Sequence, residues 1–322
     1  MVLAAGVGER MRPLTDRAPK PLLPVANRPV MGYVLEHLAR HGFTEVIANL
    51  HYRARDIEAH FRDGGQYGVS LSYSHEEELL GSAGGLKRCQ ETFSEEDFLV
   101  TGADDLTDMN LTAMLAAHRA AGAIASIGLV EVAETSEYGI VVTDEAGRIQ
   151  HFVEKPTGPA PSNTANTQIY LFRQEIFSFI PEAGFYDFGK QVFPALVAAG
   201  LPFYGFRLEG YWRDIGSVKD YLAAQWDVLE GRLDATRPGE ELSPGLRVGD
   251  GGSLSPRAKL VPPVLVGDRC TVGQEAVLGP KVVLGNDVAV GAGARLSDCV
   301  VWEGVAVPAG AEHAHAVITP EE

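Results

Sequence analysis

Residues 1–29 of the chain read MVLAAGVGERMRPLTDRAPKPLLPVANRP. A short apolar strand runs directly into Gly6 and Gly8, and the loop after it carries Arg10 and Lys20 among prolines. Glycine lets backbone N–H groups come close to a ligand, and such loops bind anions. Arginine and lysine in the same loop add the positive charge that a triphosphate requires. The segment therefore predicts a phosphate-binding loop at the end of a strand.

Two familiar phosphate motifs are excluded in this loop. The P-loop pattern requires Gly-Lys-Ser/Thr, which does not follow Gly8, and the dinucleotide fingerprint requires a third glycine where the chain has Met11. The segment as a whole resembles the signature of the sugar-1-phosphate nucleotidyltransferases, the enzymes that make nucleotide sugars. In that family the residues matching Arg10 and Lys20 hold phosphates. The resemblance also implies nucleotide contacts from the start of the loop, namely Leu3, Ala4, Ala5, Gly6 and Gly8.

The composition narrows the class of protein. With 45% hydrophobic and 22% charged residues, the chain has the composition of a soluble globular protein, and its 322 residues favour two domains. A formal net charge of -16 argues against a nucleic acid or an anionic membrane as partner. No run of eighteen apolar residues and no secretory signal is visible. The three cysteines are far apart and show no metal or disulfide spacing, so we expect free thiols in a reducing cytoplasm.

Strand and helix patterns alternate through about the first 230 residues. Such alternation predicts an α/β fold, a Rossmann-like domain with a mostly parallel sheet covered by helices. In these sheets ligands bind beyond the carboxyl ends of the strands. We expect strands over 45–50, 69–73 and 98–102, a strand pair within 140–149, a loop over 158–165, and helices over 31–40, 111–121, 188–199 and 217–231.

A strict repeat follows in the last third of the chain. Aliphatic residues recur every six positions, and a glycine follows five of them. This hexapeptide period is typical of a parallel β-helix, in which three short faces make one coil. The repeating positions are Leu254, Leu260, Val266, Val272, Leu278, Leu284, Val290 and Leu296. The predicted organisation is a catalytic domain over 1–233, a linker over 234–253, and a short left-handed β-helix over 254–322. About three coils leave an open end, which favours a homo-oligomer formed through the β-helix.

Two carboxylates point to a divalent cation. The predicted strand 98–102 is followed by Ala103-Asp104-Asp105-Leu106, and a carboxylate at the end of a strand is a suitable Mg²⁺ ligand. In the family this strand ends in Gly-Asp-x-Leu with a metal-binding aspartate, which implies that role for Asp104; Ala103 stands where glycine is usual. Trp212-Arg-Asp-Ile-Gly216 resembles the second metal motif and implies that Asp214 shares one Mg²⁺ with Asp104.

A further set of residues resembles the sugar phosphate site of the family. Phe152-Val-Glu-Lys-Pro156 matches its Glu-Lys-Pro motif, which implies that Glu154 accepts hydrogen bonds from sugar hydroxyls and Lys155 binds the phosphate. On a strand these two side chains alternate in direction, so both require polar surroundings. Gln168 departs from the family, which usually has glycine there. Tyr138, Gly139 and Asn166 match sugar-contacting positions.

Residues 76–84 carry the expected base contacts. Leu80-Gly-Ser-Ala-Gly84 resembles a turn that packs against the base and ribose, which implies contacts from Gly81, Ser82 and Ala83. Glu76 falls where uridylyl and thymidylyl enzymes often carry a base-reading glutamine. A carboxylate only accepts hydrogen bonds, and guanine offers two adjacent donors, so Glu76 favours guanine.

These features predict transfer of a nucleotidyl group from a nucleoside triphosphate to a sugar 1-phosphate, with Mg²⁺ as cofactor. Mannose 1-phosphate with GTP is the favoured pair, and glucose 1-phosphate with UTP, dTTP or ATP is the alternative. Two other classes are weighed: a non-catalytic regulatory subunit of the same fold, and a bifunctional enzyme with an acyltransferase β-helix, which requires more coils and a histidine on an extended loop. Because Met1 lies almost on the glycine loop, we also expect the natural start of the protein upstream of it.

Overall fold

The computed structural model describes residues 1–93 and 97–320. The chain divides into two compact units. The first contains Met1–Leu22 and Met31–Asp214, and the second contains Leu23–Val30 and Ile215–Glu322.

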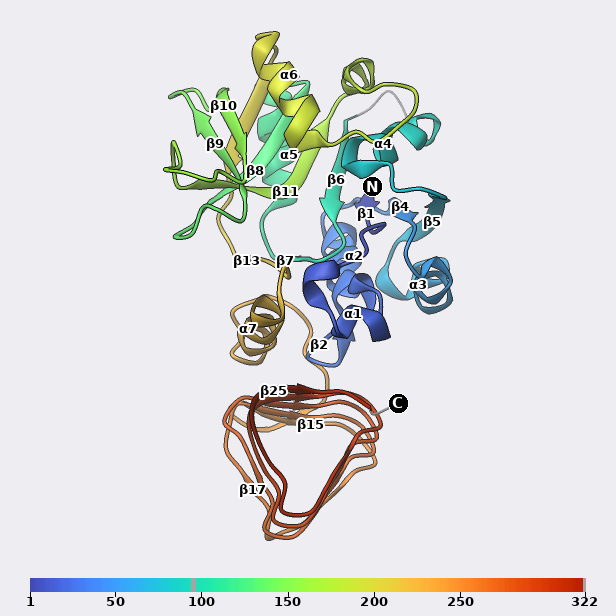
Figure 1. Cartoon of the computed structure of the whole chain (residues 1–322), viewed down its shortest axis with the longest axis vertical. Coiled ribbons are helices and arrows are strands. Elements are labelled where there is room, and N and C mark those ends of the chain that lie inside the picture. The colour runs from blue at the N-terminus through green and yellow to red at the C-terminus, as the bar shows by residue number, and fades with distance from the viewer. Residues whose placement is uncertain (94–96, 321–322) are drawn as a thin grey trace. The chain divides into compact units, whose positions relative to one another are not determined.

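A nine-stranded sheet forms the centre of the first unit (Figure 1). Its strands are β1 (Val2–Leu3), β4 (Glu45–Leu50), β5 (Ser70–His75), β6 (Phe98–Gly102), β8 (Ala125–Glu131), β9 (Gly139–Thr143), β10 (Ile149–Glu154), β11 (Thr164–Phe172) and β12 (Phe203–Arg207). They follow the order β12-β8-β11-β6-β1-β4-β5, and the antiparallel pair β9–β10 joins the sheet at β11. Pairing is parallel from β5 to β6 and between β8 and β12, whereas β11 is antiparallel to its neighbours. The predicted mostly parallel α/β class is confirmed.

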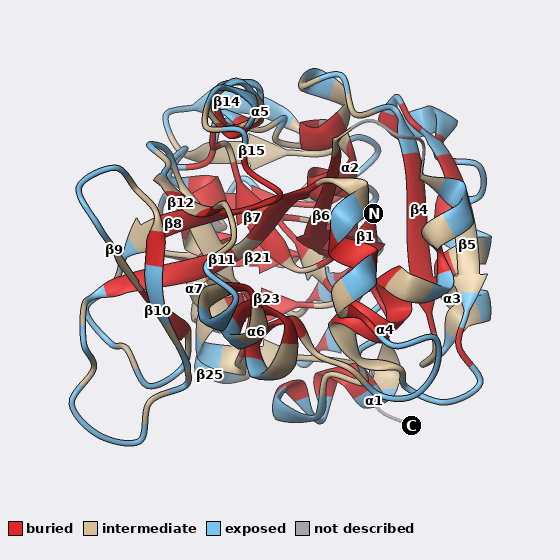
Figure 2. Ribbon diagram, turned by 90° about the horizontal axis from the view of Figure 1, so that it is seen from above, coloured by how far each residue is buried: buried red, intermediate tan, exposed pale blue. Residues whose placement is uncertain are grey.

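Helices cover both faces of this sheet and bury two separate cores. The helices are α1 (Leu14–Arg17), α2 (Val30–Arg40), α3 (Ala54–Phe61), α4 (Gly81–Arg88), α5 (Leu111–Ala120) and α6 (Phe193–Ala198), with a π-helical turn at Phe188–Val192. Neighbouring strand residues point to opposite faces. Leu99 therefore packs with α2, α3 and α5, and Val100 packs with α4 and α6. The central strands are accordingly buried along most of their length (Figure 2). Among the helices that the structure describes, none has both the length and the apolar composition needed to cross a bilayer.

The second unit contains a parallel β-helix of triangular cross-section (Figure 1). Its strands are β15 (Leu246–Val248), β16 (Ser253–Leu254), β17 (Lys259–Leu260), β18 (Val264–Val266), β19 (Thr271–Val272), β20 (Val277–Leu278), β21 (Val282–Leu284), β22 (Ala289–Val290), β23 (Arg295–Val301), β24 (Ala306–Val307) and β25 (Glu312–Ile318). Equivalent residues of successive coils pair in register, as Leu254 does with Val272, and Val272 with Val290. The aliphatic positions of the hexapeptide pattern thus stack in columns, and most of them are buried in one core.

The predicted linker over 234–253 is wrong. β14 (Glu240–Ser243) pairs with β15, and β15 pairs in parallel with β18, so the β-helix begins earlier than predicted and β16, β19, β22 and β24 form four rungs on one face. The change between the two units also falls after Asp214, ahead of the predicted boundary at 233.

The second unit also includes a hairpin from the N-terminal part of the chain. The hairpin consists of β2 (Pro24–Val25) and β3 (Arg28–Pro29), and it packs with α7 (Val218–Leu229). The Ala26 N–H donates to Gln225 Oε1 at 2.7 Å, and Asn27 Nδ2 donates to the Leu284 carbonyl oxygen at 2.7 Å. These long-range bonds, which have no local sequence signature, explain why the sequence did not predict this division.

The buried His37 of α2 predicts a pH-dependent stability. Burial, with smaller contributions from His41 and Arg40, lowers the pKa of His37 to about 4. The unfolded chain takes up this proton near pH 6.5, so stability is complete above that pH and is lost as the pH falls towards 4. Between pH 7.5 and pH 5 we expect the wild type to lose about 2 kcal/mol more unfolding free energy than His37→Gln. Urea unfolding at both pH values measures the difference; equal losses would refute the assignment.

Candidate active site

The glycine loop follows β1 directly, at the carboxyl ends of the central strands, as predicted. Gly8 has φ +71°, and a Cβ placed there would lie 2.8 Å from Thr15 Cγ2, so the fold requires glycine at this position. Gly6 differs, because no atom lies within 4 Å of the position its Cβ would occupy. Its missing side chain leaves the backbone open to the surroundings, which is what close approach of a ligand requires.

Substitution by alanine should affect a different property at each of these two glycines: stability at Gly8, and nucleotide binding at Gly6. Gly8→Ala should lower the unfolding free energy by about 1–2 kcal/mol, because L-residues are strained at positive φ. Gly6→Ala should leave stability unchanged and raise KM for the nucleotide about tenfold, equivalent to about 1.4 kcal/mol. Thermal unfolding and steady-state kinetics of both variants test this. A Gly6→Ala protein with wild-type KM would show that no ligand approaches the loop there.

A buried chain of hydrogen bonds joins the glycine loop to the turn at residues 80–84. The Ala4 N–H donates to Asn49 Oδ1 at 3.0 Å, and Asn49 Nδ2 donates to Glu76 Oε1 at 2.7 Å. Glu76 Oε2 in turn accepts from the Leu80 N–H at 3.0 Å. Each oxygen of Glu76 therefore accepts a hydrogen bond within the protein, and the residue is only 5% exposed, so its carboxylate is not open to a base. The structure contradicts the prediction that Glu76 reads the base, because the carboxylate is used to hold two loops together.

Glu76→Gln tests this correction. An amide keeps one acceptor but places an NH2 group against one of the two donors, so we expect a loss of about 1–3 kcal/mol of unfolding free energy. The ratio of kcat/KM between nucleoside triphosphates should stay the same, because Glu76 does not contact the base. A changed ratio in a variant of unchanged stability would restore the base-reading role.

Two short strands bring the predicted acidic residues together. β7 (Asp105–Thr107) pairs antiparallel with β13 (Trp212–Asp214), and Asp214 lies opposite Asp105 in the register. Lys20 forms an ion pair with Asp104, and its Nζ lies 3.7 Å from Asp214 Oδ1. Burial alone would lower the pKa of Lys20, but the two carboxylates outweigh it and raise the pKa, so the ammonium stays charged.

A third carboxylate, Asp105, lies beside this pair. Burial, and then the charges of Asp104 and Asp214, raise its pKa well above the ordinary value, and Lys20 and the Gly102 backbone offset this only in part. A Cβ on Gly102 would lie 2.3 Å from Asp105 Oδ2 and 2.9 Å from Asp104 Oδ1. Glycine at 102 therefore makes room for both carboxylates.

The side chain of Glu154 is held between two glycines. Its Oε2 lies 2.5 Å from the position of a Cβ on Gly189 and 3.0 Å from that on Gly139, so neither position tolerates a side chain. Burial, followed by the charge of Asp187, raises the pKa of Glu154. Lys155 has φ +43°, which ends the strand there. β10 ends at Glu154, so Lys155 lies outside the strand, and both residues line one cavity.

The bulge in β11 positions Asn166 and Gln168. Asn166 Nδ2 donates to the Tyr170 hydroxyl at 2.9 Å, and Asn166 Oδ1 accepts from the Gln168 N–H at 2.8 Å. Gln168 has φ +61°, a conformation that favours glycine. This explains in physical terms why glycine is expected at this position.

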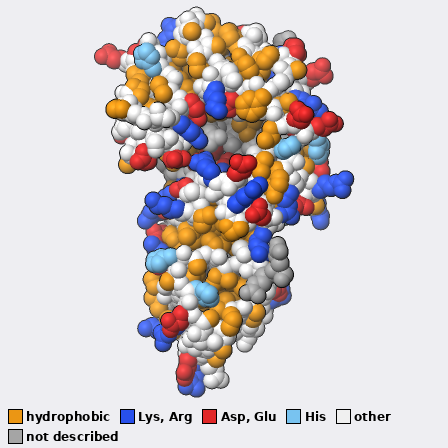
Figure 3. Space-filling view, viewed as in Figure 1, with side chains coloured by type: hydrophobic (Ala, Val, Ile, Leu, Met, Phe, Trp, Pro, Cys, Tyr) orange, Lys and Arg blue, Asp and Glu red, His pale blue; other side chains and the backbone are white. Residues whose placement is uncertain are grey.

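A cavity of about 260 Å³ collects most of the predicted site residues. Those that line it are Leu3, Arg10, Lys20, Ser82, Asp104, Tyr138, Gly139, Glu154, Lys155, Asn166 and Asp214. Predicted contacts that do not line it are Ala4, Ala5, Gly6, Gly8, Glu76, Gly81 and Ala83. Acidic and basic side chains surround a hollow on the face shown in Figure 3. The cavity thus places positive groups and carboxylates of the first unit within one pocket.

Comparison with known proteins places the chain in a family. Residues 1–231 match the family model described as Nucleotidyl transferase. The chain belongs to the nucleotidyl transferase family. Residues 260–321 of this nucleotidyltransferase match a second model, the GMPPB C-terminal domain.

The relatives of this nucleotidyltransferase act on different sugars and bases. A UTP–glucose-1-phosphate uridylyltransferase of Synechocystis sp. is 43% identical over 264 residues, which cover 77% of this chain and 68% of the relative. A mannose-1-phosphate guanylyltransferase of Mycobacterium tuberculosis is 34% identical over 263 residues, covering 80% and 72%. A solved structure of UDP-glucose pyrophosphorylase with UDP-glucose has a TM-score of 0.62 at 23% identity, covering 72% of this chain and 98% of that one, and supports the fold alone.

Several residues of the candidate site were not predicted from the sequence. Asp187 lines the cavity, and its Oδ2 accepts from the Ser82 hydroxyl at 2.9 Å, which links the 80–84 turn to the π-helical turn. The only local signal is the sequence Asp187-Phe-Gly-Lys190, which no motif marked as special. Glu137 forms an ion pair with Arg10 at 2.8 Å. The other missed lining residues are Tyr170, Phe188 and Gly189.

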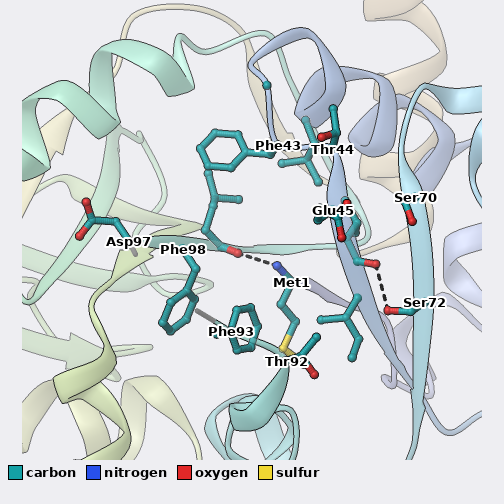
Figure 4. Close-up of a pocket in the computed structure, with 15 residues that line it drawn as sticks. Met1, Phe43, Thr44, Glu45, Ser70, Ser72, Thr92, Phe93, Asp97 and Phe98 are labelled. Atoms are coloured by element: carbon teal, nitrogen blue, oxygen red, sulfur yellow. Dashed lines mark hydrogen bonds between the residues drawn. The ribbon is translucent and has the colours of Figure 1, made fainter. Parts of the chain in front are cut away.

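A second cavity, of about 420 Å³, is lined by residues at the amino ends of β4, β5 and β6 (Figure 4). Val2, the first residue of β1, pairs with Ala48 and Thr101. β4 and β6 therefore each begin three residues before the point where β1 begins to pair. The Met1 amino group donates to the Leu99 carbonyl oxygen at 2.6 Å, and burial lowers its pKa to about 5. Its lining residues are not shared with the candidate active site, whose cavity contains residues at and beyond the carboxyl ends of β1, β6 and β10.

Proposed function

We propose that this nucleotidyltransferase transfers a nucleotidyl group from a nucleoside triphosphate to a hexose 1-phosphate, releasing pyrophosphate. One observation carries the proposal. A single cavity is lined by Lys20 and Arg10 from the glycine loop, by Asp104 and Asp214, and by Lys155. These are the groups needed to hold two phosphorylated substrates side by side.

The proposed reaction is a direct displacement at the α-phosphorus. An oxygen of the sugar phosphate forms the new P–O bond, and the bond to pyrophosphate breaks. The nucleophile is already an anion at neutral pH, so catalysis consists mainly of positioning and charge stabilisation. Lys155 orients the attacking phosphate, and Lys20 and Arg10 neutralise the triphosphate. Arg10 is half exposed and paired with Glu137, so it exchanges a surface ion pair for a phosphate contact.

In this proposal Glu154 and Asn166 form the part of the cavity that binds the sugar. Glu154 is fixed between Gly139 and Gly189, and Asn166 is fixed by its bond to Tyr170. Glu154 presents carboxylate oxygens to sugar hydroxyls, and Asn166 Oδ1, which accepts one bond from the Gln168 N–H, has a second lone pair for a sugar hydroxyl. Rigid acceptors of this kind discriminate between hexoses that differ in the direction of one hydroxyl.

The acidic residues fit a divalent cation. Their donor atoms are all carboxylate oxygens, which suit a hard cation such as Mg²⁺, and the buried oxygens of Asp105 have no hydrogen-bond partner of ordinary geometry among the described residues. Asp104 and Asp214 would hold the cation. When bound, it supplies positive charge to the phosphate oxygens of the reacting centre.

Mannose 1-phosphate with GTP is the first substrate pair we propose. The match of residues 260–321 to the GMPPB C-terminal domain supports it, as do relatives named mannose-1-phosphate guanylyltransferase. Glucose 1-phosphate with UTP is the second pair, because the relative that is 43% identical carries that activity in its name. Because Glu76 is buried and bonded within the protein, it does not favour guanine over uracil. Assembly of copies through the β-helix stays a prediction.

Product analysis distinguishes the two pairs. Purified protein is incubated with Mg²⁺ and each of the two substrate pairs and the two crossed pairs, and nucleotide sugars are identified by mass. GDP-mannose alone supports the first pair, and UDP-glucose alone supports the second. Tight binding of nucleotide sugars without turnover by folded protein would favour the regulatory-subunit alternative.

A further inference from the structure

The carboxylate of Asp105 has no evident structural use. It is 1% exposed, and neither oxygen forms a hydrogen bond of ordinary geometry with any residue that the structure describes. Burying a charged or polar group without a partner costs free energy, and an apolar residue of similar size would avoid that cost. Ala103 and Leu106, on either side of the acidic pair, are buried apolar residues of this kind. The environment at 105 therefore favours an apolar residue on grounds of stability alone.

The position of Asp105 directs its carboxylate towards the acidic pair. In the β7–β13 ladder Asp105 lies opposite Asp214. Its Oδ2 and Asp104 Oδ1 both approach the same point above Gly102, at 2.3 Å and 2.9 Å from the position of a Cβ there. Asp105 is thus a close neighbour of both residues that would hold a cation.

The charge balance of this group is incomplete. Lys20 is the cation that pairs with Asp104 and lies 3.7 Å from Asp214, and Asp105 lies beside both aspartates, so one ammonium faces three carboxyl groups. A divalent cation supplies the positive charge that one lysine does not. In the described part of the chain, no three His, Cys, Asp or Glu side chains are arranged so that they could already hold a metal ion. Lys20 occupies Asp104 and Asp214, and a cation competes with it for them.

We propose that Asp105 is a third carboxylate of the divalent-cation site and strengthens cation binding by Asp104 and Asp214. The inference rests on the proposed function, which gives those two residues the cation. Asp105 follows Asp104 at the position that the Asp-x-Leu motif leaves unspecified, so the motif itself assigns it no role.

Binding of Mn²⁺ alone to the metal-free full-length protein tests the proposal, with free Mn²⁺ followed by electron paramagnetic resonance. Asp105→Asn should raise the Kd for Mn²⁺ about 10- to 100-fold. The same substitution should raise the thermal unfolding temperature of the metal-free protein, because it removes a buried acidic group. Asp16→Asn, an exposed carboxylate ion-paired with Arg12, is the matched control and should change neither quantity.

Other outcomes separate the two proposals. If Asp104→Asn and Asp214→Asn weaken Mn²⁺ binding while Asp105→Asn binds as the wild type does, Asp105 has only a packing role and the inference is overturned. If all three variants bind Mn²⁺ like the wild type, the cation site itself is wrong. Asp105→Ala provides a second variant in case the amide disturbs folding, and it should weaken binding to the same extent.

Discussion

Lys20→Met lowers kcat by about 100- to 1,000-fold in our account, the loss typical of removing one charged contact to a transition state. Lys20 is almost buried and lines the cavity between Asp104 and Asp214. In this proposal its ammonium group contacts phosphate oxygens only when substrates are bound. Methionine keeps the length and the packing of the side chain but removes the charge. We expect kcat and kcat/KM to fall together, because the contact is strongest in the transition state.

Arg12→Met is the matched control for this variant. Arg12 belongs to the same basic loop, is 56% exposed and pairs with Asp16 outside the cavity. Its removal should change kcat less than about twofold, since exposed ion pairs contribute little. Pyrophosphate release under saturating substrates measures both variants. Equal effects of the two substitutions would mean that the loop acts only through its overall charge.

Asp104→Asn is expected to lower kcat by about 100-fold or more and to raise the Mg²⁺ concentration for half-maximal activity. Asparagine has the size of aspartate but lacks the negative charge that a hard cation requires. The fold should survive, because Asp104 is near the surface of the cavity with 15% of its side chain exposed, and its described ion pair is with Lys20.

Circular dichroism and a magnesium titration of activity examine this variant together. Asp16→Asn, on the exposed part of the basic loop, should behave as the wild type in both. A folded Asp104→Asn protein with full activity and an unchanged magnesium requirement would contradict the role of Asp104.

Local patterns predicted the parts of the fold whose cause is local. The apolar run 98–102 became β6 with the predicted bounds, because both faces of that strand are covered by helices. The hexapeptide repeat predicted the columns of the β-helix, because its period equals one face of a coil. Lys20, Asp104 and Asp214 were predicted from their motifs, and the structure brings them together.

Features that depend on distant partners could not be predicted in this way. Glu76 looked free to meet a base, but Asn49 and Leu80 occupy its oxygens, and only the fold brings Asn49 close to it. The hairpin at Leu23–Val30 joins the second unit through Gln225 and Leu284, about 200 or more positions away in sequence. Asp187 is linked to the site through Ser82, a contact that spans 105 positions of the chain.

The most direct test of the proposed function is pyrophosphate release by the purified protein with Mg²⁺, measured for GTP, UTP, dTTP, ATP and CTP against mannose 1-phosphate and glucose 1-phosphate. We predict turnover that requires both substrates and is strongest for GTP with mannose 1-phosphate. Turnover strongest for UTP with glucose 1-phosphate would keep the reaction and change the substrates. No pyrophosphate release from folded protein in any combination would contradict the proposal that this cavity catalyses nucleotidyl transfer to these hexose phosphates.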